Sequence, residues 1–156
     1  MPGGVAPLIR PADSRDLPVL TLLVEAYWKF ERIKGFDPLR ATNLLTDLFR
    51  APDRGQIWIA QFDGQPAGYL LAVYLFSLEH GGLMAEIDEF FVTPEMRSRN
   101  IGGALLDEAI AAMAKRGITH FQLQLGANNP LGQRFYQKHG FEALSAYRLL
   151  HRSLRP

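Results

Sequence analysis

The sequence has 156 residues, of which 47% are apolar and 21% are charged. This length and this balance are typical of one folded domain with a single core, and they argue against a disordered chain. The formal net charge is only +1, which excludes the broad positive field of a nucleic-acid-binding surface, so we expect no nucleic-acid partner. Cysteine is absent, which excludes disulfide bonds, thiolate zinc sites and a cysteine nucleophile.

The ends of the sequence and its longest apolar runs bear on location. Residues 1–6 lack the long apolar core of a signal peptide, and we expect them to be a flexible N-terminus. No run approaches the ~18 apolar residues that a membrane helix needs, so we expect no membrane partner and a cytoplasmic protein. Residues 7–156 show no repeat, linker or charge block and are predicted to form one domain.

The first half of the chain alternates between strand and helix patterns. Asp13 is a helix-capping signal, Gly35 is expected to end the first helix, and Asp63-Gly64 is a hairpin turn signal. Apolar residues at helical or alternating spacing predict a strand over 7–12, helices over 17–33 and 38–50, and strands over 56–62 and 66–78. The last of these strands is almost continuously apolar, which is typical of a central strand buried on both faces.

The second half predicts a parallel strand pair joined by a helix. The strand over 83–92 ends at Thr93-Pro94, because proline cannot donate to a central ladder. The elements expected after it are a helix from 102 to about 116, a strand over 119–125, a helix over 131–139 and a strand over 147–154. A helical connection makes the strands before and after it parallel, so we expect an α+β domain with a mixed sheet.

The turn after the strand over 83–92 is basic and short. Arg97, Ser98, Arg99 and Asn100 lie between this strand and the helix that follows. The backbone N–H groups at a helix start and the positive end of the helix dipole attract anions. The sequence therefore predicts an anion site at this turn.

This turn, a second motif and the order of elements resemble the GNAT superfamily of acetyl-coenzyme A dependent N-acetyltransferases. The family's loop reads Arg or Gln, two residues, Gly, one residue, then Gly or Ala; here Arg97 opens it, Gly102 closes it, and Asn100 stands where the first glycine belongs. Ser98 also departs from a frequent glycine. Asparagine tolerates a left-handed backbone best among non-glycine residues, so the turn can survive. A second register that begins at Arg99 also fits, but the distance from Val92 favours the first.

The resemblance implies a fold and a cofactor. The fold is an α/β/α sandwich whose mixed, mostly antiparallel sheet has a splayed parallel central pair and helices on both faces. It implies acetyl-coenzyme A as cosubstrate, no metal, and a homodimer. The residues it assigns to the cofactor are Phe90, Phe91, Val92, Arg97, Ser98, Arg99, Asn100, Ile101, Gly102, Gly103 and Asn129.

The second motif runs from Asn129 to Phe141 and resembles the family's Asn-x-x-Ala-x-x-Phe-Tyr-x-x-x-Gly-Phe, with Gly132 in place of the alanine. The resemblance implies that Asn129 contacts the pantetheine arm and that Tyr136 donates a proton to the departing thiolate. A phenol with a pKa of about 10 is protonated at neutral pH and can serve as that acid.

Acetyl transfer also needs a base, because an ammonium group is not a nucleophile. The candidates are Asp88 first and then Glu86, acting directly or through water. Strict alternation places both on the face of Phe90 and Val92 and turns Glu89 the other way; the bulge that the family often carries here would change this. The alternative is that these acids only attract a cationic substrate or face solvent.

The acceptor is predicted from a finer resemblance. The stretch from Asp88 to Val92 looks like the matching strand of the diamine (spermidine/spermine and thialysine-like) acetyltransferases, with the two acids swapped, which suggests a small cationic amine. The residues that would flank this acceptor are Trp28, Tyr27, Glu31 and Glu89. A protein or peptide N-acetyltransferase and a non-catalytic acyl-coenzyme A binding module remain as alternatives. A nucleotide-binding protein is disfavoured, because the loop lacks a Gly-Lys-Ser/Thr ending.

Overall fold

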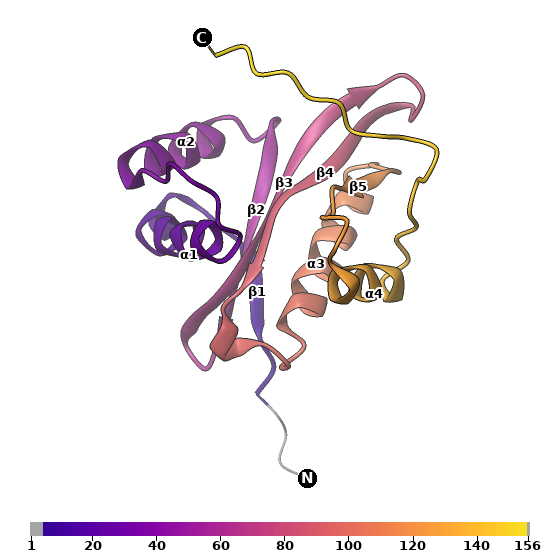
Figure 1. The fold of residues 1–156 in the computed structure, drawn as a ribbon. Coiled ribbons are helices and arrows are strands. Elements are labelled where there is room, and N and C mark those ends of the chain that lie inside the picture. Colours follow the sequence, from indigo (N-terminus) through magenta and orange to yellow (C-terminus); the bar gives the residue numbers. More distant parts are fainter. Residues whose placement is uncertain (1–4, 156) are drawn as a thin grey trace. The chain divides into compact units, whose positions relative to one another are not determined.

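The structure is a computed structural model that describes residues 5–155. The flexible N-terminus expected over 1–6 falls largely on residues 1–4, which lie outside the described residues. The chain divides into two compact units, with the boundary between Leu123 and Gln124. Each unit is described by itself (Figure 1).

The first unit is a mixed sheet with helices on both faces. Its elements are β1 (Leu8–Pro11), the 3-10 helix η1 (Ser14–Asp16), α1 (Leu17–Phe30), α2 (Pro38–Arg50), β2 (Gly55–Phe62), β3 (Gln65–Ser77), β4 (Gly82–Val92), the 3-10 helix η2 (Pro94–Met96), α3 (Ile101–Lys115) and β5 (Phe121–Leu123). The strand order is β1-β2-β3-β4-β5, with β4 and β5 parallel and the other pairs antiparallel. The predicted α+β fold with a parallel pair is confirmed.

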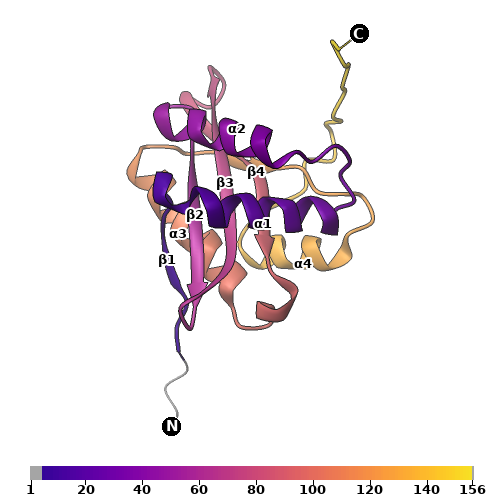
Figure 2. The same ribbon diagram turned by 90° about the vertical axis from the view of Figure 1, so that its left-hand side faces the viewer.

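Two helices cover one face of this sheet and α3 covers the other, as Figure 1 shows. Figure 2 views the unit from the side of α1 and α2, which cross in front of β2, β3 and β4. On this face buried residues of α1 pack against β2 and β3; the cluster is Leu20, Leu23, Val24, Leu45, Ile57, Ile59, Tyr69, Leu71 and Phe91. The other face buries Leu105, Leu106, Ala109 and Met113 of α3. The buried residues that α1 and α3 contribute fall at the three- and four-residue spacing of an amphipathic helix.

β3 is buried on both faces only along part of its length. Residues 67–72 are buried without interruption, which confirms the prediction for this part of the strand. Beyond Val73 the strand becomes more exposed, because β2 pairs with β3 no further than Gly55↔Val73 and the hairpin of β3 and β4 continues past the sheet. The turn between β2 and β3 is the predicted one, with Asp63 and Gly64 at φ 50° and 72°, as in hairpin turns of two residues.

A network of charged hydrogen bonds holds the start of α1. Asp13 and Asp16 cap each other's backbone N–H groups around η1. Both terminal guanidinium nitrogens of Arg10, Nη1 and Nη2, donate to Asp16, at 2.8 and 2.7 Å. This contact lowers the pKa of Asp16, because the hydrogen bonds from Arg10 favour the carboxylate. The predicted capping signal therefore also joins β1 to the start of α1.

α1 ends earlier than predicted. The helix stops at Phe30, and Arg32 takes a left-handed conformation at φ 57°. Gly35, the predicted end, is also left-handed, at φ 82°, but lies beyond the helix. Arg32 N donates to Lys29 O and Ile33 N to Trp28 O, which is the hydrogen-bond pattern of a Schellman motif. The prediction was wrong because it relied on glycine, the usual residue at this position, whereas here an exposed arginine occupies it.

β4 contains a bulge at its carboxylates. Leu71 of β3 pairs with Glu89 and the next residue, Ala72, pairs with Ile87, so Asp88 is the extra residue. Val73 pairs with Glu86, and both Leu71 and Val73 belong to the face covered by α1 and α2. Paired residues share a face, so Glu86 and Glu89 point to the same side. The alternation that set Glu89 opposite to Glu86 was therefore wrong.

The second unit contains α4 (Pro130–Lys138). Asn129 caps this helix, and its Oδ1 accepts a hydrogen bond from Gly132 N at 2.9 Å. A Schellman motif closes the helix, with Gly140 at φ 85° and the amide of Phe141 donating to Tyr136 O. The strand predicted over 147–154 was wrong, since these described residues form no helix or strand. A strand exists only beside a hydrogen-bonded partner, which an apolar pattern cannot supply.

Candidate active site

The loop between β4 and α3 has an unusual backbone. Ser98 and Asn100 both lie in the left-handed region, at φ 63° and 57°. Asn100 precedes α3 without capping it through its side chain. The first intrahelical bond runs from Ala104 N to Asn100 O, so the amides of residues 101–103 precede the ladder and have no acceptor within the helix. This turn presents backbone N–H groups at the positive end of the helix, as an anion site requires.

The side chain of Arg97 is turned to the end of α1. Its Nε donates to Val92 O at 3.1 Å. Its guanidinium carbon lies 4.4 Å from the ring centroid of Phe30 and 5.9 Å from that of Phe91. An arginine over an aromatic face gains a cation–π attraction in addition to its hydrogen bond. The loop is thus attached to both β4 and α1.

Arg99 is attached to a different element. Its guanidinium carbon lies 4.9 Å from the ring centroid of Phe62, the last residue of β2. The two basic side chains of the loop therefore rest on aromatic rings that come from two separate parts of the sheet and helix layers.

A carboxylate held by two aromatic donors connects α1 to β4. Trp28 Nε1 donates to Glu89 Oε1 at 2.8 Å, and the Tyr69 hydroxyl donates to Glu89 Oε2 at 2.7 Å. Burial raises the pKa of Glu89, and the two hydrogen bonds partly offset this by stabilising the carboxylate. Two of the predicted acceptor residues, Trp28 and Glu89, are thus in direct contact.

Tyr27 lies close to this contact, and nearby carboxylates affect its pKa. Its ring lies 5.9 Å from that of Phe91 and packs edge-on against Tyr69 at 6.4 Å. Burial first, and then the charges of Glu89, Glu31 and Asp88, raise the pKa of Tyr27 to about 12. All four predicted acceptor residues therefore belong to one region, in which α1 faces the carboxylates of β4.

Asp88 differs from its two acidic neighbours. Both oxygens of Glu89 accept hydrogen bonds, and Glu86 Oε2 accepts one from Gln122 Nε2 of β5 at 2.6 Å. Asp88, at the bulge, accepts no hydrogen bond from residues 5–155. The residue is exposed, yet the protein around its carboxyl group limits hydration; this effect, and then the charge of Glu86, raises the pKa of Asp88.

The edge of β4 that faces β5 is paired over a short stretch. The parallel register covers only Ala85↔Phe121, Glu86↔Gln122 and Ile87↔Leu123. β4 continues beyond this pairing through the bulge to Val92. The predicted cofactor residues Phe90, Phe91 and Val92 lie in this continuation, with Phe91 buried against α1.

The predicted residues of the second unit form a local cluster. Tyr136 lies in α4, with its ring 5.2 Å from Phe135 and 5.5 Å from Phe141. Gly132 is explained by its neighbours: a Cβ there would lie 2.8 Å from Asn129 Nδ2 and 2.9 Å from a methyl group of Leu125. The departure from the family's alanine thus accommodates the side chain of Asn129.

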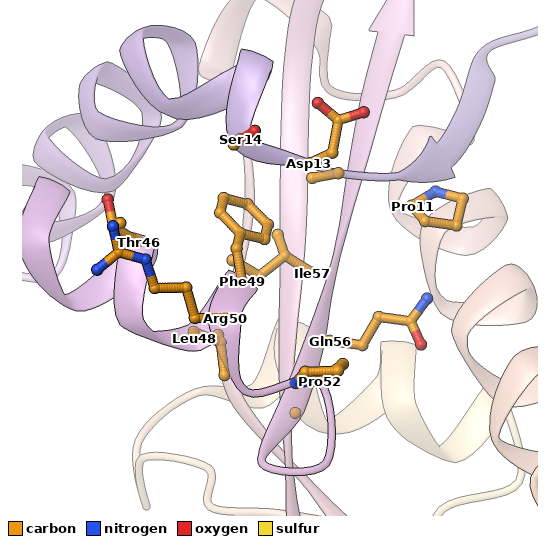
Figure 3. Close-up of a pocket in the computed structure, with 12 residues that line it drawn as sticks. Pro11, Asp13, Ser14, Thr46, Leu48, Phe49, Arg50, Pro52, Gln56 and Ile57 are labelled. Atoms are coloured by element: carbon orange, nitrogen blue, oxygen red, sulfur yellow. The ribbon is translucent and has the colours of Figure 1, made fainter.

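A pocket lies away from these residues. It has a volume of about 670 Å³, and Figure 3 shows that its lining comes from the end of β1, the end of α2 and the start of β2. The lining includes Asp13, Phe49, Arg50 and Ile57 but none of the predicted site residues. This pocket lies over β1 and β2, whereas the acidic residues are on β4. We assign it no role in the chemistry.

Over residues 5–155, no group of three or more histidines and carboxylates is arranged to hold a metal ion. His80 and His120 stack with ring centroids 3.7 Å apart. No helix in the same range is long and apolar enough to cross a membrane.

Three contributors to the site were missed from the sequence. Tyr69 and Gln122 donate to Glu89 and Glu86, and Phe30 carries the guanidinium of Arg97. The signal for Tyr69 was present, because a tyrosine in a buried strand needs a partner for its hydroxyl group. Phe30 and Gln122 have no such signal, since only the packing of α1 and β5 beside β4 brings them to the site.

Comparison with known proteins identifies the family. The model of the family described as "Acetyltransferase (GNAT) family" matches residues 20–141, which is more than half of the chain. The protein is therefore an acyltransferase enzyme. It belongs to the GNAT acetyltransferase family, whose members use acetyl-coenzyme A.

Three curated relatives are N-acetyltransferases by name. An uncharacterized N-acetyltransferase of Methanocaldococcus jannaschii is 34% identical over 92 residues, which are 58% of this chain but only 40% of the relative. One of Archaeoglobus fulgidus is 29% identical over 130 residues, 82% of this chain and 88% of the relative. A spermidine N(1)-acetyltransferase of Thermoplasma acidophilum is 38% identical over 58 residues, 37% of this chain and 36% of the relative.

Solved structures share the fold. An integron cassette protein from the mobile metagenome of Cole Harbour Salt Marsh has a TM-score of 0.84 at 28% identity, covering 95% of this chain and 91% of the other. The aminoglycoside N-acetyltransferase AAC(6')-Iy, in complex with CoA, has a TM-score of 0.83 at 20% identity, covering 99% of each chain. The second likeness, at this identity, concerns the fold alone.

Proposed function

We propose that the protein transfers the acetyl group of acetyl-coenzyme A to a primary amine of a small cationic molecule by direct attack. The observation that carries this proposal is the acidic region between α1 and β4, where Trp28 of α1 donates to Glu89 of β4. Burial first, and then the charges of Glu89, Glu31 and Asp88, raise the pKa of Tyr27 in this region. A region of negative charge lowers the free energy of a bound ammonium group. The named spermidine acetyltransferase relative supports the same class of acceptor.

The cosubstrate would bind at the loop before α3. Backbone N–H groups of residues 101–103, with the positive charges of Arg97 and Arg99 nearby, suit a pyrophosphate. The pantetheine arm would extend along β4 past Ile87, where the pairing with β5 ends. A backbone N–H near Val92 would polarise the thioester carbonyl as its oxygen gains charge.

Asp88 is proposed as the base. It is exposed and its pKa is raised, so its carboxylate is a stronger proton acceptor than an ordinary aspartate. Directly or through water, it would take a proton from the ammonium group, and the free amine would attack the acetyl carbonyl. Glu86, which accepts a hydrogen bond from Gln122, is the second candidate for the base. Tyr136 would then donate its phenolic proton to the thiolate as the carbon–sulfur bond breaks, and Asn129 would contact the pantetheine arm.

The cosubstrate proposal is tested by heat stability. Acetyl-coenzyme A at 100 times its dissociation constant stabilises a native protein by about 2.7 kcal/mol. We expect the melting temperature to rise with ligand concentration accordingly. No rise at saturating acetyl-coenzyme A would remove the cofactor and, with it, the reaction.

The acceptor and the base are tested together by release of free thiol. A panel of polyamines, aminoglycosides, amino acids and peptides would be assayed with the wild type and with Asp88→Asn. We expect turnover on small polycations, and a loss of about 10²- to 10⁴-fold in Asp88→Asn if Asp88 is the base. Turnover on peptides alone would instead indicate a protein N-acetyltransferase, and coenzyme A binding without any turnover a non-catalytic module. The homodimer and the cytoplasmic location stay predictions.

A further inference from the structure

The guanidinium group of Arg97, in the loop before α3, contacts the end of α1, the helix that carries residues predicted to flank the acetyl acceptor. It donates to Val92 O at 3.1 Å and stacks on Phe30 at 4.4 Å. Phe30 is the last residue of α1 and is 52% exposed. Phe30 and the buried Phe91 are 6.0 Å apart.

The end of α1 is closed by a turn with an unfavourable backbone conformation. Its closing turn holds Arg32 in the left-handed conformation, which glycine adopts routinely but which is unfavourable for most L-residues. Three amides make the closing hydrogen bonds: Glu31 N to Tyr27 O, Arg32 N to Lys29 O and Ile33 N to Trp28 O. Two of the three residues whose carbonyl groups accept these bonds, Tyr27 and Trp28, also face the carboxylates of β4.

We infer that Arg97 is a positioning residue that couples the cofactor loop to the C-terminal turn of α1, so that coenzyme A bound at the loop also orders the acceptor side. The inference rests on the proposed function, because it needs the pyrophosphate at the loop. Binding that fixes the loop fixes Arg97, and Arg97 then holds Phe30 through its stacked face. By linkage, an ordered α1 end would in turn favour coenzyme A.

A different role for Arg97 makes different predictions. If its charge alone served the pyrophosphate, lysine would replace it and α1 would be unaffected by its loss. A positioning role needs the planar fork, which donates through Nε while its face covers a ring, and lysine offers neither. The variants Arg97→Lys, Arg97→Ala and Phe30→Leu therefore separate the two roles. Arg116→Ala is the matched control, since Arg116 is stacked on Tyr74 at 4.6 Å on a remote part of the unit.

The test is amide hydrogen exchange over residues 28–33, with and without saturating coenzyme A. In the wild type and in Arg116→Ala we expect coenzyme A to slow exchange at Glu31, Arg32 and Ile33. An exposed cation–π contact corresponds to about a two- to fivefold effect, and we expect slowing of this size. In Arg97→Lys, Arg97→Ala and Phe30→Leu this slowing should disappear, while exchange in the loop over 98–103 is still slowed by coenzyme A.

Each other result overturns the inference. Slowing at α1 that persists in Arg97→Ala would show that another contact carries the coupling. Slowing retained in Arg97→Lys would assign the effect to charge. Coenzyme A that binds the wild type without changing exchange at residues 31–33 would overturn the coupling and leave the proposed function intact, whereas no binding to the wild type would remove both.

Discussion

Trp28 Nε1 lies 2.8 Å from Glu89 Oε1, and this hydrogen bond joins α1 to β4 across 61 residues of sequence. The other oxygen of Glu89 accepts from Tyr69, so the carboxylate has a fixed position. Trp28 and Glu89 were both predicted to flank the acetyl acceptor. In the structure these two side chains are hydrogen-bonded to each other. We therefore expect the acceptor to meet a surface whose shape this hydrogen bond fixes.

Replacing Glu89 with glutamine should change the pH dependence of stability. The folded-state pKa of Glu89 is raised above its ordinary value of 4.5, so between these two values the folded protein holds a proton that the unfolded chain has lost. The wild type therefore loses stability as the pH rises through this window, and the loss is constant above it. Glu89→Gln has no such titration and can still accept from Trp28.

The measurement is urea unfolding of both proteins from about pH 4 to about pH 8. The unfolding free energy of the wild type minus that of Glu89→Gln should fall as the pH rises and then level. Glu89→Ala is the control for the hydrogen bonds: it leaves the donors of Trp28 and Tyr69 unsatisfied and should cost about 1–3 kcal/mol. A difference between wild type and Glu89→Gln that is the same at every pH would contradict the assignment.

Asn100 should tolerate glycine and not alanine. Its φ of 57° is left-handed, a conformation that costs an ordinary L-residue roughly 1–2 kcal/mol. We expect Asn100→Ala to lower the unfolding free energy by about 1 kcal/mol and to weaken coenzyme A binding, and Asn100→Gly to do neither. Asn43, exposed within α2, is the matched control, because there glycine should be worse than alanine by about 1 kcal/mol. The same order at both positions would disprove a left-handed Asn100.

Gly68 should not accept a side chain. A Cβ at this position would lie 2.3 Å from Phe91 O, on the strand that carries the predicted cofactor residues. Gly68→Ala must push β3 from β4, and we expect a loss of about 1–3 kcal/mol on unfolding. Gly126→Ala, with nothing within 4 Å of its Cβ and no positive φ, should be nearly neutral. Equal melting temperatures for the two variants would contradict the close approach of these strands.

Tyr136 should act on turnover more than on binding. Tyr136→Phe keeps the ring that packs against Phe135 and Phe141 but removes the proton donor. If it is the acid, kcat at neutral pH should fall by about 100-fold or more, with little change in the dissociation constant of acetyl-coenzyme A. Tyr147→Phe, at an exposed tyrosine of the same unit, is the control for loss of a hydroxyl group. Unchanged turnover in Tyr136→Phe would remove it from this role.

The sequence by itself determined the elements whose signal is local. Asp13, and Asp63 with Gly64, are cap and turn residues whose own chemistry sets the neighbouring backbone, and the structure has them where they were predicted. The parallel pairing of β4 and β5 followed from the helix between them. The strand expected over 147–154 failed because pairing needs a partner.

The residues of the candidate site also fall into two groups: those that the sequence predicts and those that only tertiary packing brings together. The basic turn and the carboxylates of β4 could be found from residue type and spacing. The bulge at Asp88 could not be located from the sequence, and it decides which carboxylates share a face. Tertiary packing alone brought Phe30 to Arg97 and Trp28 to Glu89, because such contacts depend on the placement of α1 over β4 rather than on any local pattern.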